Sequence, residues 1–242
     1  MKFSKQILCL ILMCPIIFPA FAQRPQSMQA GANFTIGIPQ NDFRENIDNN
    51  AFGGTGFFLY NIPRSPVHIG ASIGFMVYGS ESYQRRLIPD VPVSVDINTT
   101  NSILQGHLIF RVQPSQSSVR PYMDGLLGFN YLSTSTSIED NDSWSNDDNI
   151  ASENNFDDGV FSYGGGAGIQ FQVYHPTDEQ IIQNNVYGVV IDIGVRYVKG
   201  GEAEYLDEGG IQYNEATKNF DFDVKRSVTD LLTWHIGFAI LF

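Results

Sequence analysis

The densest group of potential metal ligands is the acidic run IEDNDSWSNDDNIASENNFDD at 138–158, which contains no basic residue. Carboxylate oxygens are the ligands that Ca²⁺ and Mg²⁺ prefer, and an EF-hand loop needs oxygen ligands at positions 1, 3 and 5 and glycine at position 6. Counted from Asp140, position 3 is Asp142, but positions 5 and 6 are Trp144 and Ser145. The run therefore favours a solvated, self-repelling loop. Weak divalent-cation binding stays open as an alternative, with the candidate ligands Asp140, Asp142, Asp147 and Asp148.

A second group consists of charged residues inside otherwise apolar segments: Arg111, Asp124, Asp192 and Arg196. Enclosed charges are stable only when they are paired. Arg111 and Asp124 flank a short connection, so they are the expected pair. Asp192 and Arg196 are four residues apart, about 13 Å on an extended strand, so each needs a partner elsewhere in the chain. The two interpretations are a buried ion-pair network, which we favour, and a path for protons or ions.

Other catalytic and metal-binding patterns are weak. The histidines are His68, His107, His175 and His235, and nothing in their spacing forms a zinc-ligand pair. No histidine and serine stand out as a convergent pair, so we expect neither an enzyme, nor a metal site, nor a cofactor. Both cysteines, Cys9 and Cys14, lie in the first 22 residues, which excludes disulfides and thiol chemistry from the rest of the chain.

The elements that position these residues follow from a period-two alternation. The run LLTWHIGFAILF at 231–242 places Leu232, Trp234, Ile236, Phe238, Ile240 and Phe242 on one side. Similar alternation occurs at 32–39, 54–62, 67–78, 102–113, 121–131, 161–174 and 186–198. This periodicity is typical of β-strands. Most of the eight segments are close to the ~9–11 residues of a tilted membrane strand, whereas ordinary strands average about 5–6.

The connections alternate in length. Short ones fall at 63–66, 114–120 and 175–185, and long ones at 40–53, 79–101, 132–160 and 199–228. Alternating short turns and long loops are typical of membrane barrels. The sequence therefore predicts an all-β fold, an eight-stranded antiparallel up-and-down transmembrane β-barrel, as one domain of residues 23–242. An even strand number places both termini on the periplasmic side. Alternation at 200–225 predicts that the seventh and eighth strands extend beyond the membrane as a hairpin with a turn near 214–218, and alternation at 92–99 predicts a similar extension before the fourth strand.

The two sides of each strand have different composition. The uniformly apolar sides would face lipid, and the polar, glycine-rich sides would face the lumen. The expected lumen residues are His68, Gln105, His107, Arg111, Asp124, Gln170, Gln172, Asp192, Arg196 and His235. Such a narrow barrel is filled by its own side chains. A soluble lipocalin-like barrel or β-sandwich is the alternative, and it would turn the apolar sides inward.

The first 22 residues have the layout of a secretory signal peptide. Lys2 and Lys5 precede the apolar run 7–19, and Ala20-Phe21-Ala22 supplies a small-x-small cleavage pattern. The run is too short to span a membrane as a helix. Without those two lysines, the 14 basic residues fall to 12 against 26 acidic ones, a net charge of −14. This charge argues against nucleic-acid binding and against a polybasic membrane-surface mode.

Three motifs suggest a family. The run RPYMDGLLGFNY at 120–131 resembles a strand of the small OmpA-like and OmpX-like outer-membrane barrels, and FTIGIPQNDFREN at 34–46 is similar to the first strand and loop of Bacteroidota-type outer-membrane barrels. The end of the chain, with Trp234, Phe238, Ile240 and Phe242, resembles the signal read by the outer-membrane assembly machinery. No peptidoglycan-binding domain follows the expected barrel, so the anchoring role of longer OmpA proteins is not carried over.

The resemblance implies a place in the outer membrane of a Gram-negative bacterium, in contact with outer-membrane lipid and lipopolysaccharide. It implies a non-catalytic role in envelope integrity, or in binding an unspecified surface ligand through the acidic loops. The alternatives are a narrow diffusion pore and a membrane-embedded lipid-modifying enzyme. The enzyme would need a serine and a histidine within hydrogen-bond reach near a rim of the barrel.

Overall fold

The computed structural model describes residues 27–86, 94–114, 117–140, 149–214 and 219–242. Side chains are described except at 83–86, 94–97, 138–140, 149–156, 207–214 and 219–222. The expected signal peptide, residues 1–22, lies outside these ranges. None of the described helices has the length and apolarity needed to span a membrane.

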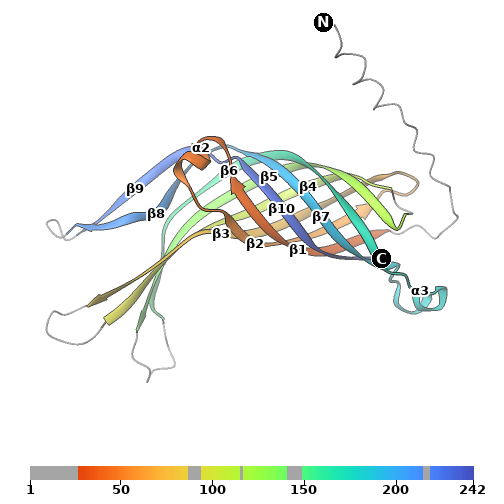
Figure 1. The fold of residues 1–242 in the computed structure, drawn as a ribbon, viewed down its shortest axis with the longest axis horizontal. Coiled ribbons are helices and arrows are strands. Elements are labelled where there is room, and N and C mark those ends of the chain that lie inside the picture. The colour runs from red at the N-terminus through yellow and green to blue at the C-terminus, as the bar shows by residue number, and fades with distance from the viewer. Residues whose placement is uncertain (1–26, 87–93, 115–116, 141–148, 215–218) are drawn as a thin grey trace, which may run out of the picture.

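Eight of the strands close into an antiparallel barrel (Figure 1). They are β1 (Met28–Pro39), β2 (Ala51–Asn61), β3 (Val67–Arg86), β4 (Ser94–Val112), β5 (Val119–Asp140), β6 (Asn149–Tyr174), β7 (Gly188–Gly200) and β10 (Leu231–Leu241). Their order is β1-β10-β7-β6-β5-β4-β3-β2, and β1 pairs with both β10 and β2 to complete the ring. Each of the eight predicted segments overlaps one of these strands, so the predicted fold is confirmed.

The long connections differ from the prediction, because much of their length is strand. The β3–β4 pairing continues to Arg86↔Ser94, and the β5–β6 pairing to Glu139↔Asn149. The expected loops at 79–101 and 132–160 were therefore wrong over most of their length, whereas the predicted extension before the fourth strand is confirmed from Ser94. Most of these segments are rich in polar residues, and the cross-strand pair Thr99↔Thr136 has its hydroxyls 3.2 Å apart. Apart from 94–99, they have no uniformly apolar side, so a search for apolar alternation does not detect them.

A hairpin is present over the predicted range 200–225, but it is a separate sheet and not the predicted extension of the last two barrel strands. It consists of β8 (Glu202–Asn214) and β9 (Asn219–Val228), which form a separate two-stranded sheet. Its predicted turn at 215–218 lies outside the described residues. Figure 1 shows this hairpin leaving the same end of the barrel as the extensions of β3–β6, whereas the C-terminus lies at the other end.

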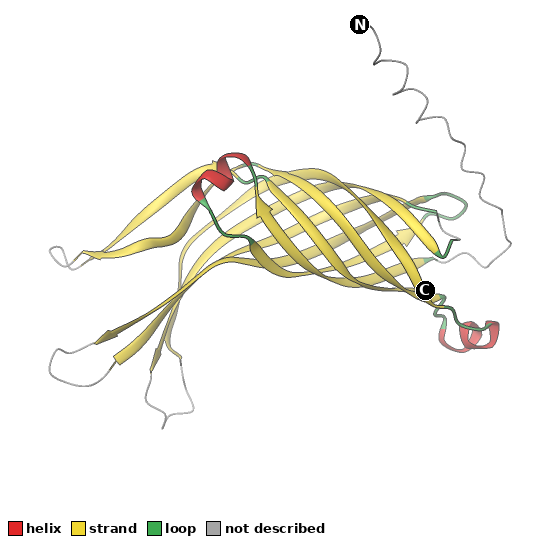
Figure 2. Ribbon diagram, viewed as in Figure 1, coloured by secondary structure: helices red, strands yellow, loops and turns green. Residues whose placement is uncertain are grey.

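Two short helices occupy connections that were expected to be loops (Figure 2). α2 (Asn41–Asn46) lies in the link after β1, at the hairpin end, and α3 (Asp178–Asn184) lies in the link after β6, at the opposite end. The α3 helix is capped at both ends: Gln180 Oε1 accepts a hydrogen bond from the Thr177 N–H at 3.0 Å, and Asn185 adopts a left-handed φ of 53°. These are ordinary helix signals, which strand periodicity does not reveal.

The apolar sides of the barrel strands face outward. Along β10, the exposed positions are Trp234, Ile236, Phe238 and Ile240, and Phe238 is 61% exposed. We call the exposed apolar side chains of the eight barrel strands the outer belt; it includes Phe34, Phe58, Ile73, Phe110, Phe129, Phe161 and Phe238. A soluble barrel would bury these side chains, and soluble monomers rarely expose so large an apolar surface. The soluble alternative is therefore wrong, and the exposed ring is the surface of a membrane-spanning barrel.

Candidate functional site

The polar side chains of the barrel strands point into the lumen. All four of the expected charged residues and the histidines His68, His107 and His235 are buried. Strand alternation explains this placement, since each inward residue lies between two outward-facing positions of its strand. The lumen is therefore the place in this fold where polar chemistry is enclosed, and we treat it as the candidate site.

The lumen contains one carboxylate shared by two arginines. Arg111 of β4 faces Asp124 of β5 in the strand register, and its Nε and Nη2 lie 2.7 and 2.9 Å from the two carboxylate oxygens. Arg196 of β7 reaches across, with Nη2 3.0 Å from Asp124 Oδ2. The pair Arg111–Asp124 is completely buried at the side-chain level. This geometry is a bidentate fork with a second cation on the same carboxylate, an arrangement that holds three strands together.

The second lumen carboxylate has a different partner. Tyr122 donates its hydroxyl hydrogen to Asp192 Oδ1 at 2.8 Å, and the same hydroxyl lies 2.9 Å from His235 Nε2. Because the tyrosine proton is used by Asp192, the imidazole must donate, so His235 carries its proton on Nε2. The Arg111 guanidinium carbon lies 3.6 Å from the centre of the Tyr122 ring. Tyr122 therefore links the two carboxylates of the lumen.

Tyr122 was not among the predicted site residues. The signal for it was present, since it lies two residues before Asp124 and shares its side of β5. A tyrosine in a strand is nevertheless equally consistent with an aromatic at the membrane interface. Asp192 and Arg196 do not contact each other through any described hydrogen bond, and each finds its partner on another strand.

Several other polar side chains of the lumen form neutral or charged pairs. His107 Nε2 lies 3.0 Å from Ser162 Oγ, Gln105 donates to Asn130 at 3.1 Å, and Gln113 donates to Gln170 at 2.7 Å. Arg120 donates to Gln172 at 2.8 Å. These contacts come from β4, β5 and β6, and they fill the cross-section above and below the central ion pairs.

An apolar cluster closes the lumen at the hairpin end. Phe43 and Ile47, at and just after α2, are buried against inward residues of the strands, including Met76, Ile103 and Leu132. The Phe43 ring makes edge contacts with Tyr78 and Tyr205, with centroids 6.2 and 5.2 Å away. The α2 segment, expected to be an open loop, is therefore a plug over the barrel mouth.

Polar contacts attach the plug to the barrel wall. Asn41 Nδ2 donates to Asp230 Oδ2 at 2.8 Å and to the Tyr197 hydroxyl at 3.1 Å, while Tyr197 donates to the same Asp230 oxygen at 2.9 Å. The backbone of Gln40 donates to the Asp230 carbonyl at 3.0 Å. Asn41 has a φ of 53°, a left-handed conformation that asparagine tolerates better than most residues. We call Asn41, Tyr197 and Asp230 the latch.

Loss of the latch should loosen α2 without unfolding the barrel. The Asn41→Ala variant removes two hydrogen bonds and places alanine at a left-handed φ, with an expected cost of about 1–2 kcal/mol. The amide of Ile47, which donates to Phe43 O at 2.9 Å, should then exchange with solvent about tenfold faster in hydrogen-exchange NMR. Asn41→Gly is the control for the backbone, since glycine accepts the φ but lacks the side chain. Unchanged exchange in both variants would contradict the latch.

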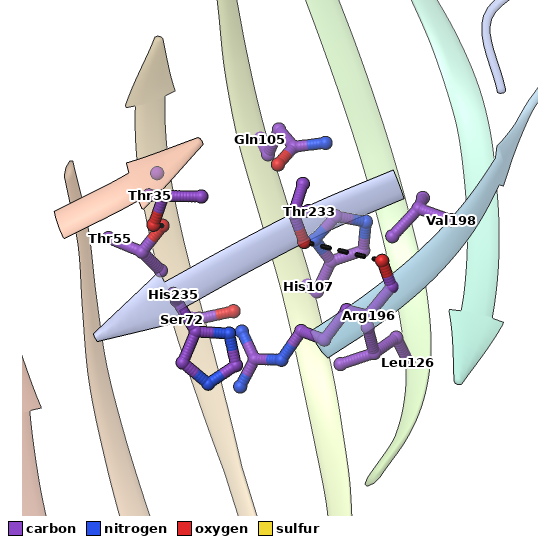
Figure 3. Close-up of a pocket in the computed structure, with 11 residues that line it drawn as sticks. Thr35, Thr55, Ser72, Gln105, His107, Leu126, Arg196, Val198, Thr233 and His235 are labelled. Carbon is purple, nitrogen blue, oxygen red and sulfur yellow. Dashed lines mark hydrogen bonds between the residues drawn. The ribbon is translucent and has the colours of Figure 1, made fainter. Parts of the chain in front are cut away.

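A small cavity lies among the side chains of the lumen. The cavity in Figure 3 has a volume of about 20 Å³. Its lining includes Thr35, Thr55, His107, Arg196 and His235, and Figure 3 shows these side chains converging from several strands. A water molecule needs roughly 10–15 Å³ of such volume, so the cavity accommodates about one water and no larger solute.

In two places a serine and a histidine lie within hydrogen-bond reach of each other, which is what the enzyme alternative requires. His107–Ser162 is buried in the lumen, and Ser162 is 0% exposed, so no lipid reaches it. Ser118 Oγ lies 3.4 Å from His175 Nε2 at the end of the barrel away from the hairpins, and both residues are exposed. In the described part of the chain, no carboxylate forms a hydrogen bond to either histidine, so neither pair has the third group that orients a catalytic base.

The candidate cation ligands fall largely outside the structure. Asp142, Asp147 and Asp148 lie outside the described residues, and only the backbone of Asp140, at the end of β5, is described. Among the described residues, no group of three histidine, cysteine or acidic side chains is placed to hold a metal ion.

The residues of the expected assembly signal lie on the last strand. Trp234, Phe238 and Ile240 point outward as part of the outer belt. Phe242 is tied to the first strand: its N–H donates to Met28 O at 2.8 Å, and its carbonyl accepts from the Ser27 and Met28 N–H groups at 2.7 and 3.0 Å. The end of the described chain therefore closes the barrel seam.

Comparisons with known proteins add solved structures of similar architecture. The chain is similar to Ail, the attachment invasion locus protein of Yersinia pestis, with 17% identity over 89% of this chain and 97% of that one and a TM-score of 0.37. It is similar to Neisserial surface protein A, with 11% identity over 88% and 94% and a TM-score of 0.37. A major outer membrane protein from Thermus thermophilus is similar at 12% identity over 88% and 99%, with a TM-score of 0.43.

No family model matches the chain, and a search of curated proteins finds no relative. The fold is therefore assigned from the strand pairing of this chain. It is a closed eight-stranded membrane barrel.

Proposed function

We propose that this protein is a non-catalytic, non-conducting barrel of a Gram-negative outer membrane, which holds β-hairpins above the membrane surface. The observation that carries the proposal is the filled lumen. The apolar plug of α2 and the polar network around Asp124 occupy the lumen, and the cavity between the lumen side chains has a volume of about 20 Å³; these observations support a lumen closed to solutes. A barrel that neither conducts nor exposes catalytic groups acts through its surfaces, which are the outer belt and the projecting strands.

The projecting strands support a role at the cell surface. β3, β4, β5 and β6 contain 20, 19, 22 and 26 residues, about twice the number needed to cross a bilayer. Their outer halves and the β8–β9 hairpin extend from the same end of the barrel (Figure 2). We infer that this end is extracellular, that both termini are periplasmic and that residues 1–22 are removed on export. Contribution to envelope integrity and binding of a surface ligand through the acidic segments are the roles consistent with this shape.

The expected partners follow from the same surfaces. The outer belt would contact outer-membrane lipid and lipopolysaccharide, and the last strand, with Trp234, Phe238, Ile240 and Phe242, would be read by the assembly machinery. The acidic residues at 138–158 would attract divalent cations weakly, because dense carboxylates repel one another less when a cation lies between them.

Conductance separates this proposal from the pore alternative. We expect the purified, refolded protein to give no sustained open channel in planar bilayers at physiological salt, because the lumen is blocked at two levels. Folding and insertion should be checked on the same sample by gel migration with and without boiling, since a folded barrel resists detergent and shifts on heating. An open porin in the same bilayer serves as the positive control. Steady ohmic conductance from heat-shifting protein would contradict the closed lumen.

A further inference from the structure

A hollow of about 470 Å³ lies on the outside of the barrel, where β2 begins and β3 continues past it. Its base is formed by Phe52 and Val77, and its polar wall by Asp48, Asn49, Asn50 and Ser80. The hollow is shallow and widely open, so a molecule bound in it would lie along the surface rather than be enclosed. Its lining also includes Tyr78 and Gly79, and the Tyr78 ring contacts Phe43 of the plug, so the hollow adjoins the mouth cluster from outside.

The strand register creates this hollow. Phe52↔Val77 is the last pair described between β2 and β3, after which β3 continues to Arg86 paired only with β4. The β3–β4 register shifts between Val77 and Gly79, and Tyr78 points inward to the mouth cluster. Such a bulge bends and twists the strand locally. The unpaired edge of β3 beyond Val77 and the segment that leads into β2 therefore form the two sides of the hollow.

The hollow lies at the upper boundary of the outer belt. Phe52 is outward-facing and 52% exposed, and Val77 is its outward neighbour on β3. The next outward position on β3 is the exposed Ser80, and the residues before β2 are the exposed Asp48, Asn49 and Asn50. Apolar side chains thus give way to polar ones within one site, at the level where a bilayer changes from acyl chains to head groups.

We propose that this hollow binds one lipid of the outer leaflet that carries a hydroxyl-rich head group. The inference rests on the proposed function, because it requires the outer belt to lie in that leaflet. The alkyl chain packs on Phe52 and Val77, and the head-group hydroxyls bond to Asp48, Asn50 and Ser80. These side chains supply carboxylate and amide oxygens as acceptors, and amide and hydroxyl hydrogens as donors.

The charge of the wall selects against other head groups. Among the described residues that line the hollow, Asp48 is the charged one and none is basic, so a phosphate would meet a carboxylate without a cation in the wall. Arg44 lies beside the site without lining it, and its Nη1 donates a hydrogen bond to Asn50 Oδ1 at 3.4 Å. Neutral hydroxyls satisfy such a wall without the cost of burying an unpaired charge.

The test uses dodecyl maltoside, an alkyl chain on a sugar, titrated into the refolded protein in dodecylphosphocholine micelles. We expect saturable NMR shifts confined to the amides of Asn49, Asn50, Gly79 and Ser80. The double variant Asp48→Ala/Asn50→Ala should weaken the apparent affinity roughly tenfold, the effect of losing two hydrogen bonds. These positions are exposed and outside the strands, so the barrel should still fold.

A matched pair tests the apolar base. Phe52→Ala should weaken dodecyl maltoside binding, whereas Phe34→Ala, on the adjacent β1 and 53% exposed, should leave it unchanged. Shifts that do not saturate, that spread equally over the outer belt, or that persist unchanged in Asp48→Ala/Asn50→Ala and in Phe52→Ala would overturn the site. Failure of the proposed function would appear differently, as conductance or as loss of the heat-dependent gel shift, and neither depends on this hollow.

Discussion

The Asp124→Ala variant should lose about 3–5 kcal/mol of unfolding free energy, the cost of removing one partner from a buried ion pair. The carboxylate is the shared partner of Arg111 and Arg196, at 2.7 and 3.0 Å, and the side chains of Arg111 and Asp124 are 0% exposed. Without it, two guanidinium groups remain enclosed in a lumen whose other carboxylate, Asp192, is engaged by Tyr122. Urea unfolding in lipid vesicles, followed by tryptophan fluorescence, measures the loss.

The matched control is Asp223→Ala. Asp223 also forms an ion pair at 2.7 Å, with Lys225, but its side chain is 63% exposed. Exposed pairs contribute about 0–1 kcal/mol, so this variant should unfold nearly as the parent does. Equal losses of unfolding free energy in the two variants would contradict the claim that the Asp124 pair stabilises the barrel because it is buried.

A double replacement separates charge from packing at the same position. In Arg111→Met/Asp124→Leu the buried pair becomes apolar, and stability should partly recover relative to Asp124→Ala, because replacing both members of a buried pair avoids an unpaired charge. Recovery will be incomplete, since Arg196 still loses its acceptor. A double variant no more stable than Asp124→Ala would indicate that the carboxylate stabilises the barrel by a contact other than its pairing with Arg111.

The second large effect is expected at Gly194 of β7. A Cβ at this position would lie 2.5 Å from the Tyr122 hydroxyl oxygen and 2.7 Å from His235 Cε1 and Nε2. Both neighbours are held by the hydrogen bonds that link them to Asp192, so they cannot move without breaking the network. Overpacking of this kind costs typically 1–3 kcal/mol. We expect Gly194→Ala to destabilise by about that amount, measured by the same urea unfolding.

The control is Gly125→Ala in β5, where the nearest atom to an added Cβ is Phe110 O at 3.8 Å. This substitution should be neutral or slightly stabilising, since alanine loses less entropy than glycine on folding. Combining Gly194→Ala with Tyr122→Phe removes the closest obstacle, so the combined cost should be less than the sum of the two single costs. Strict additivity would place the strain elsewhere.

The strands, their number and their inward and outward sides could be predicted because they depend on local information. In β10, residues 231–241, successive side chains point to opposite sides of the sheet, so the apolar set faces one environment along the whole strand. The same logic placed Arg111, Asp124 and His235 inside. It also favoured the Arg111–Asp124 pair, since strands joined by a short connection are neighbours. The polar extensions of β5 and β6 escaped detection, because serine and threonine in β5 and asparagine and acidic residues in β6 leave no apolar period.

What the sequence determined by itself is the barrel and the composition of its two surfaces, since a side chain's direction along a strand is set by the strand alone. The contacts across the lumen were decided by the tertiary structure. Arg196 reaches Asp124, Tyr122 links Asp192 to His235, and Phe43 plugs the mouth. These partners lie on strands or helices far apart in the chain. Strand tilt and ring closure determine which inward residues meet at one height, and no local pattern contains that information.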